Sequence, residues 1–201
     1  MNKKAKILLI SVLGILMILL LTALIFLVSV RGEFVKHLDE KYPDLSFTVG
    51  IAKIDPIYDS FYAEVTCLDD YTPFLISRGF KSQDIYEDYL ECKSQNGYNS
   101  KINNVFYMSE IESKIKSVTG LGKEFFTNDA IYTQINIYLV DNAEHISVAK
   151  KAMNLLDEHN ISAETIILTY EKDNHVYEIW LSSDDYSLTE NEIEEKVKKI
   201  K

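Results

Sequence analysis

The chain has 201 residues, 47% of them apolar and 26% charged, which is the composition of a globular protein with room for one ordinary domain or two small ones. Its formal net charge is −10, and residues 31–201 alone hold 18 basic and 31 acidic side chains, a net charge of −13. Such acidity excludes nucleic acid as a partner, because phosphate binding requires clustered lysine and arginine.

An uncharged apolar run from Ile7 to Val30 predicts a transmembrane helix. Helical residues over this run span about 36 Å, enough to cross a hydrocarbon core of about 30 Å with some tilt. Lys3, Lys4 and Lys6 precede the run, whereas only Arg31 follows it closely. The positive-inside rule therefore places the N-terminus in the cytoplasm and the region after Arg31 outside the cell, in a single-pass topology.

A cleaved signal peptide is the alternative interpretation of the same run. Its apolar core would be shorter, about 7 to 15 residues, and would end in small residues at a cleavage site. Here the run ends Phe26-Leu27-Val28-Ser29-Val30, and no cysteine lies nearby for lipoprotein processing. We therefore expect an uncleaved signal anchor.

Residues 31–98 are expected to form a first extracytoplasmic unit with the element order α-β-β-β-α. In chain order the expected elements are a helical extension of the span to Lys41, strands over 46–54, 60–68 and 74–77, and a helix over 84–95. Pro43 ends the helical extension, because a residue before proline is pushed out of the α region. The strands are predicted from alternating apolar and polar side chains, with Asp55-Pro56 at one of the turns.

Residues 99–201 are expected to form a second unit with the order α-β-α-β-β-α. The expected elements are a helix over 109–118, a strand over 130–140, a helix over 141–159, strands over 164–171 and 175–183, and a helix over 189–200. Capping boxes predict the helix starts at Ser109, Asp141 and Thr189, each with a glutamate three residues later.

These patterns together predict an α+β protein with mainly antiparallel sheets. Its expected organisation is a cytoplasmic tail over 1–6, a transmembrane helix over 7–30, and two extracytoplasmic units over 31–98 and 99–201.

The sequence predicts no catalytic, cofactor-binding or metal-binding residue. The four histidines are His37, His145, His159 and His175. None lies in an H-E-x-x-H motif, and no two have the i, i+4 spacing of a helical zinc site. Nucleophile-elbow, P-loop and dinucleotide-binding motifs do not occur in the sequence either.

Two acidic pairs and a group of tyrosines each have a structural and a functional interpretation. Asp69-Asp70 and Asp184-Asp185 could supply an acid and a base or bind Ca²⁺, but adjacent carboxylates at a turn more often hydrogen-bond their own backbone. Tyrosines on strands usually line a small sheet, although they can also form a recognition surface. The tyrosines of the first unit that raise this question are Tyr58, Tyr62, Tyr71, Tyr86 and Tyr89.

The chain has two cysteines, Cys67 and Cys92, each on the predicted apolar face of its element. We expect them to share one core. A disulfide between them would close a loop of about 25 residues and stabilise the fold by roughly 3 kcal/mol on the chain-entropy model, and the oxidising side of a membrane permits it. Two free buried thiols are the alternative.

The first half of the chain resembles a known group of bacterial proteins. The motifs that carry the resemblance are Lys41-Tyr42-Pro43, Phe47-Thr48-Val49-Gly50, Tyr58-Asp59-Ser60-Phe61-Tyr62-Ala63-Glu64-Val65 and Glu87-Asp88-Tyr89-Leu90, all after a transmembrane run. The pattern resembles the uncharacterised YfjL-like membrane-anchored proteins of low-GC Gram-positive bacteria, with a weaker likeness to the short DUF3139 proteins. The resemblance implies a location in the bacterial cell envelope and implies no activity.

We therefore expect a membrane-anchored, non-enzymatic binding or interaction module that takes a protein, peptide or wall component, with the edge of either sheet as a candidate surface. The alternative is a cell-envelope hydrolase whose carboxylates assemble only in three dimensions. A pocket that converges on Asp69, Asp70 or a histidine would favour the hydrolase, and a flat tyrosine-rich face would favour the binding module.

Overall fold

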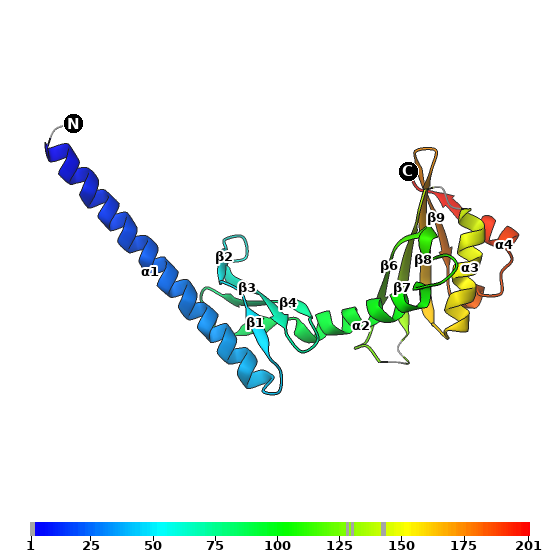
Figure 1. Cartoon of the computed structure of the whole chain (residues 1–201), viewed down its shortest axis with the longest axis horizontal. Helices are drawn as coiled ribbons and strands as arrows, with labels where there is room; N and C mark the ends of the chain where they lie inside the picture. The colour runs from blue at the N-terminus through cyan, green and yellow to red at the C-terminus, as the bar shows by residue number, and fades with distance from the viewer. Residues whose placement is uncertain (1–2, 128, 130, 142–143) are drawn as a thin grey trace. The chain divides into compact units, whose positions relative to one another are not determined.

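The computed structural model describes residues 3–127, 129, 131–141 and 144–201, with side chains described from Ser11 onward. It divides into two compact units, Met1–Cys92 and Lys93–Lys201, which run from blue to green and from green to red in Figure 1. The sequence prediction placed this boundary between residues 98 and 99. The architecture is α+β with two mostly antiparallel sheets and one N-terminal apolar helix, which confirms the predicted fold class.

Helix α1 (Lys3–Lys41) is continuous from the apolar run into the first unit. Within the described residues, its segment Ser11–Lys41 is the one helix long and apolar enough to cross a membrane. The helix ends at Lys41, as predicted, because Pro43 restricts the residue before it.

The sheet of the first unit is antiparallel throughout. Its strands are β1 (Phe47–Val49), β2 (Lys53–Asp55), β3 (Ser60–Cys67), β4 (Pro73–Gly79) and β5 (Ile85–Glu87), in the order β1-β3-β4-β5 with β2 also paired to β3. The single strand predicted over 46–54 is therefore two strands. Both strands pair with β3. Residues 50–52 lie opposite only residues 63–64 of β3, so one extra residue bulges out of the ladder between β1 and β2.

The core of the first unit lies between α1 and one face of this sheet (Figure 1). Val30, Phe34 and Leu38 recur every fourth residue, which places them on one face of α1, and all three are completely buried. The alternate residues of β3 and β4 face them, which are Phe61, Ala63, Val65, Cys67, Phe74 and Ile76.

The helix predicted over 84–95 was wrong at its start and its end. Ile85–Glu87 pairs with β4 as β5, and α2 (Tyr89–Phe106) begins after it. Glu87 Oε2 accepts a hydrogen bond of 2.7 Å from the Tyr89 amide and so supports the first turn of α2. The helix continues through Gly97 instead of ending at residue 95. A Cβ atom at position 97 would lie 2.4 Å from the Phe126 ring. This close contact requires glycine inside the helix.

The sheet of the second unit has the order β10-β9-β8-β7-β6, and only the pair β7–β8 is parallel. The elements after α2 are the short 3₁₀ turn η1 (Glu112–Lys114), β6 (Ile115–Gly122), β7 (Tyr132–Leu139), α3 (His145–Glu158), β8 (Ala163–Lys172), β9 (His175–Leu181), the 3₁₀ turn η2 (Ser183–Asp185), α4 (Glu190–Glu194) and β10 (Val197–Lys199). The predicted strand over 130–140, the helix over 141–159 and the hairpin over 164–183 are confirmed in type, although Ala130, Asn142 and Ala143 lie outside the described residues. The capping box predicted at Asp141 was wrong, because α3 begins at His145 with Glu144 as its N-cap and without a side-chain cap hydrogen bond.

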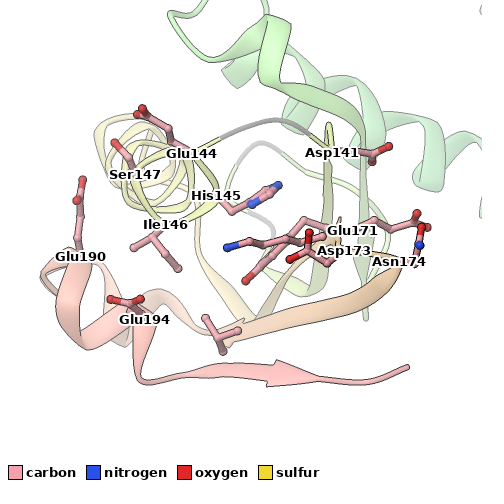
Figure 2. Close-up of a pocket in the computed structure, with 13 residues that line it drawn as sticks. Asp141, Glu144, His145, Ile146, Ser147, Glu171, Asp173, Asn174, Glu190 and Glu194 are labelled. Atoms are coloured by element: carbon pink, nitrogen blue, oxygen red, sulfur yellow. The ribbon is translucent and has the colours of Figure 1, made fainter.

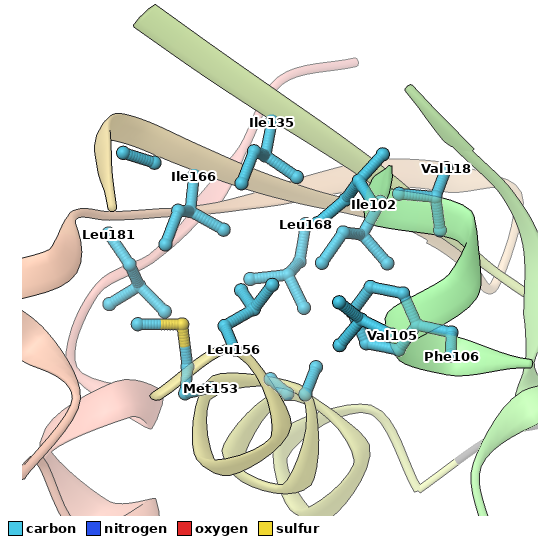
Figure 3. Packing of buried hydrophobic residues seen from close by; sticks show 14 of the residues in the cluster. Ile102, Val105, Phe106, Val118, Ile135, Met153, Leu156, Ile166, Leu168 and Leu181 are labelled. Carbon is cyan, nitrogen blue, oxygen red and sulfur yellow. The ribbon is translucent and has the colours of Figure 1, made fainter. Parts of the chain in front are cut away.

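Helices α2, α3 and α4 contribute to the core of the second unit, which packs against the sheet. Figure 3 shows Ile102 and Phe106 of α2 and Leu156 of α3 against the sheet residues Ile135 and Leu168. The parallel pair β7–β8 requires a crossover, and α3 supplies it.

Two helices predicted in this unit were wrong. The segment over 109–118 forms η1 and then β6. A bulge between Ile115 and Ser117 shifts the alternation of the strand and leaves Ile115 and Val118 three residues apart, a spacing that is also typical of a helix. The segment over 189–200 begins as a helix with the predicted box, since the Glu192 amide donates to Thr189 Oγ1 at 3.4 Å. It ends at Glu194, however, because β10 pairs with the exposed edge of β9.

Candidate interaction groove

A broad hollow of the second unit lies between the N-terminus of α3, the β8–β9 hairpin and α4. It is an open groove of about 980 Å³ (Figure 2). The hairpin forms one wall through a two-residue turn at Asp173 and Asn174, whose φ angles are 54° and 61°. Two successive positive φ angles are the signature of a type I′ turn, which matches the twist of the flanking strands.

Three stacked rings form the apolar part of the groove region. The His145 ring lies 3.9 Å from the Tyr170 ring with an interplanar angle of 13°, and Tyr170 stacks on Tyr177 at 5.3 Å. His145 Nε2 lies 3.3 Å from the Val140 carbonyl oxygen, so this nitrogen carries the proton and donates it. The ring is therefore held on one face by Tyr170 and at one nitrogen by the backbone.

The His145 side chain is uncharged near neutral pH. Its burial lowers its pKa below the usual 6.5, and nearby Lys172 lowers it further, although the Val140 carbonyl and Asp141 oppose the shift. A neutral His145 ring therefore does not offset the negative charge of the carboxylates that line the groove.

Carboxylates surround the three rings on all three walls. Those lining the groove are Asp141, Glu144, Glu171, Asp173, Glu190 and Glu194. Figure 2 shows Glu144 beside the start of α3, Glu171 and Asp173 on the hairpin, and Glu190 and Glu194 on α4. Lys172 is the basic side chain among the lining residues. Carboxylates next to aromatic faces can attract and hold a basic side chain by charge and by cation–π contact.

The described residues contain no group of three or more histidine, cysteine, aspartate or glutamate side chains placed to hold a metal ion. The groove carboxylates therefore do not converge on a common point. Their arrangement suits a ligand with several separated positive charges.

The two cysteines lie where the sequence placed them, in one core. Cys67 is completely buried, and Cys92 is partly buried against the same cluster. Both are free thiols in the structure. The Cys67 thiol donates to the Tyr89 hydroxyl at 3.6 Å, and burial together with Asp88 raises the pKa of Cys92. The raised pKa of Cys92 is the opposite of the lowered pKa that activates a reactive cysteine.

The acidic pairs hydrogen-bond the backbone, and of their members Asp70 and Asp185 do so within their own turns. Asp69 Oδ2 accepts from the Ser46 amide at 2.7 Å. Asp70 accepts from the Thr72 amide at 3.1 Å and from the Tyr89 hydroxyl at 2.9 Å. Asp184 is exposed beside Asp185, which accepts from the Ser182 amide at 2.9 Å and so closes a capping box. Neither pair lines the groove.

One predicted binding surface is closed. The outer edge of β6 is covered by amide side chains of α2: Asn99 accepts from the Gly120 amide at 3.0 Å, and Asn103 donates to the Val118 carbonyl at 3.3 Å. Gln95 also donates to the Gly120 carbonyl. A strand edge whose backbone groups are already bonded offers few sites to an added strand. The β10 edge borders the groove through Val197.

Sequence reasoning missed the groove because its residues come from three distant segments. In the sequence, His145 lies outside any zinc motif, and no local pattern links it to the carboxylates of the hairpin and of α4. The tyrosines of the first unit differ in exposure: Tyr89 is buried in the core, whereas Tyr58, Tyr71 and Tyr86 are exposed.

Comparison of the chain with protein-family models, curated proteins and solved structures found no match.

Proposed function

We propose that this chain is a single-pass membrane protein whose second unit is a non-enzymatic interaction module outside the cytoplasm. The observation that carries the anchor is the change of burial along α1. Its side chains from Ser11 to Phe26 are exposed and almost entirely apolar, whereas Val30, Phe34 and Leu38 are buried in the first unit. Exposed apolar side chains on all sides of a helix require a non-aqueous surrounding.

The charge distribution supports the orientation. The lysines lie before the apolar run, and the acidic units lie after it, so the positive-inside rule favours a cytoplasmic N-terminus. The resemblance of the segment from His37 to Tyr89 to YfjL-like proteins supports a bacterial cell-envelope location.

The acidic groove supports a basic segment of another protein as the partner. The lining carboxylates outnumber Lys172, and His145 is neutral, so the groove attracts lysine and arginine over a distance set by the ionic strength. The stacked rings next to these carboxylates offer a surface for the apolar stems of such side chains.

The test is binding of a lysine- and arginine-rich peptide to the full chain in detergent, measured by fluorescence anisotropy. We expect the double variant Glu190→Gln/Glu194→Gln to weaken binding about three- to tenfold, because each exposed carboxylate contributes modestly. The matched control is Asp157→Asn/Glu158→Gln, which removes the same charge at the other end of α3. Equal loss in both variants would show attraction to net charge alone and would contradict a groove-specific site.

A second candidate function is the cell-envelope hydrolase. The observation that favours it is His145 within an acidic groove, because a histidine beside a carboxylate can act as an acid or base. We rank it second because Nε2 is bonded to the Val140 carbonyl and one ring face is covered by Tyr170. Hydrolysis of a wall polymer that His145→Phe abolishes would reverse this ranking.

A further inference from the structure

The turn between β2 and β3 carries large apolar side chains that none of the described residues of the first unit covers. Ile57 is 84% exposed and Tyr58 is 79% exposed, and Ile54 on β2 is 54% exposed. The turn is nevertheless ordered, because Asp55 Oδ1 accepts from the amides of Ile57 at 2.9 Å and Tyr58 at 3.2 Å. A fixed turn therefore presents apolar side chains outward.

Contacts inside the first unit place this turn beside the apolar run of α1. Phe61 is the cross-strand partner of Ile54, and its ring lies 5.3 Å from the ring of Phe26. Phe80 extends this row, with its ring 4.7 Å from Phe61. Phe26 lies one helical turn inside the end of the apolar run at Val30. The turn is thus level with the last part of the proposed span (Figure 1).

The other end of the sheet lies far from that level. The Tyr42 ring lies 5.8 Å from the ring of Phe47, which pairs with Cys67 at the end of β3. Strand β3 therefore runs in the same direction as α1. Phe26 and Tyr42 are separated by about 24 Å of helix, so Tyr71, in the turn after β3, lies roughly that much farther from the span.

We propose that the β2–β3 turn is a second membrane contact, in which Ile54, Ile57 and Tyr58 enter the interfacial region of the outer leaflet beside α1. The inference rests on the proposed anchoring by α1. Lipid is the occupant because the exposed face of α1 at the level of Phe26 is itself in contact with lipid, and the apolar surface of the turn continues it. Tyrosine suits this depth, since its ring is apolar and its hydroxyl remains in the headgroups.

Charges near the turn limit how deeply it enters. Asp59 is exposed next to Tyr58, and Lys53 forms an ion pair of 2.6 Å with Glu64. Charged side chains are costly in the hydrocarbon core but tolerated among headgroups. The contact is therefore shallow, and it depends on apolar side chains rather than on attraction to anionic lipid.

The test uses the full chain in phosphatidylcholine vesicles that contain lipids brominated near the top of the acyl chains. Trp180 is the chain's one tryptophan, so the variant Trp180→Phe removes the native signal. Into it we place Tyr58→Trp or, as the matched control, Tyr71→Trp, because both tyrosines are 79% exposed and both lie in turns next to β3. A third variant, Leu20→Trp, reports on the span.

We expect the bromines to quench Tyr58→Trp several-fold more than Tyr71→Trp, with emission from position 58 shifted to shorter wavelength. Equal, weak quenching at positions 58 and 71 while Leu20→Trp is quenched would overturn the second contact and leave the anchor standing. No quenching of Leu20→Trp would overturn the anchor itself, and the second contact with it.

Discussion

Replacing Phe34 with alanine tests whether helix α1 is part of the core of the first unit. Phe34 lies on α1, is completely buried, and packs in the cluster that contains Val65 and Cys67 of β3. Removing a buried phenylalanine ring typically destabilises a fold by about 3–5 kcal/mol, from the lost burial and the cavity left behind. We therefore expect Phe34→Ala to raise the population of the opened first unit by roughly 150- to 4,000-fold.

The assay uses a thiol as the reporter of this unit. Cys67 is completely buried, so a thiol reagent reaches it only when the unit opens. In a Cys92→Ser background, Cys67 is the single cysteine of the chain. Where closing is faster than labelling, the labelling rate measures the open population, and we expect Phe34→Ala to raise this rate by the same factor. Trp180 reports separately on the second unit.

The matched control is Lys36→Ala on the same helix. Its ammonium group is exposed and pairs with Glu40 at 3.6 Å, an interaction of about 0.3–0.5 kcal/mol. We expect the labelling rate of Cys67 in this variant to change less than about threefold. If Phe34→Ala labels at the rate of the parent chain, α1 is not part of the core, and the reasoning is refuted.

Three further predictions concern single residues. The lowered pKa of His145 means that the unfolded chain binds a proton more readily than the folded one, so the stabilising contribution of His145 is present above about pH 6.5 and is lost as the pH falls. Unfolding followed by Trp180 fluorescence should therefore show a steeper loss of stability from pH 7.5 to 5 in the parent chain than in His145→Phe. Equal pH slopes in the two proteins would contradict this prediction. Gly97→Ala should destabilise the second unit by about 1–3 kcal/mol, because the added Cβ atom meets the Phe126 ring, and this cost exceeds the gain from the better helix propensity of alanine. A higher denaturation midpoint in this variant would refute the contact. Thiol counting on protein unfolded without reductant should find two free thiols, as the structure has them, and a count of zero would contradict the free thiols.

The parts of the fold that sequence reasoning predicted correctly are those where the local pattern and the tertiary contacts agree. The helical extension of the apolar run to Lys41 was predicted correctly, because Phe34 and Leu38 lie on one buried face of the helix. Strand β3 was readable because its alternation is uninterrupted from Ser60 to Cys67. The shared core of the two cysteines followed from strand alternation at Cys67 and helical spacing at Cys92, although α2 begins and ends later than the helix predicted over 84–95.

The errors arise where a distant partner decides the local structure. The bulge at Ile115 gives β6 a spacing that imitates a helix, and only the pairing with β7 identifies it as a strand. Val197–Lys199 could continue α4 by its own pattern, but β9 offers an open edge and pairs with it. The groove could not be predicted for the same reason, since pairing and packing bring Glu144, Glu171 and Glu194 to one place.

The position of the chain relative to a membrane is the central claim, and accessibility to protease tests it most directly. The full chain is produced in bacterial cells whose walls are then removed, and protease is added to the intact cells. We predict that residues after Arg31 are digested while an N-terminal fragment containing α1 is protected, and that undigested protein begins at Met1 by mass spectrometry. Full protection of the C-terminal region, or a mature N-terminus near Arg31, would contradict the account.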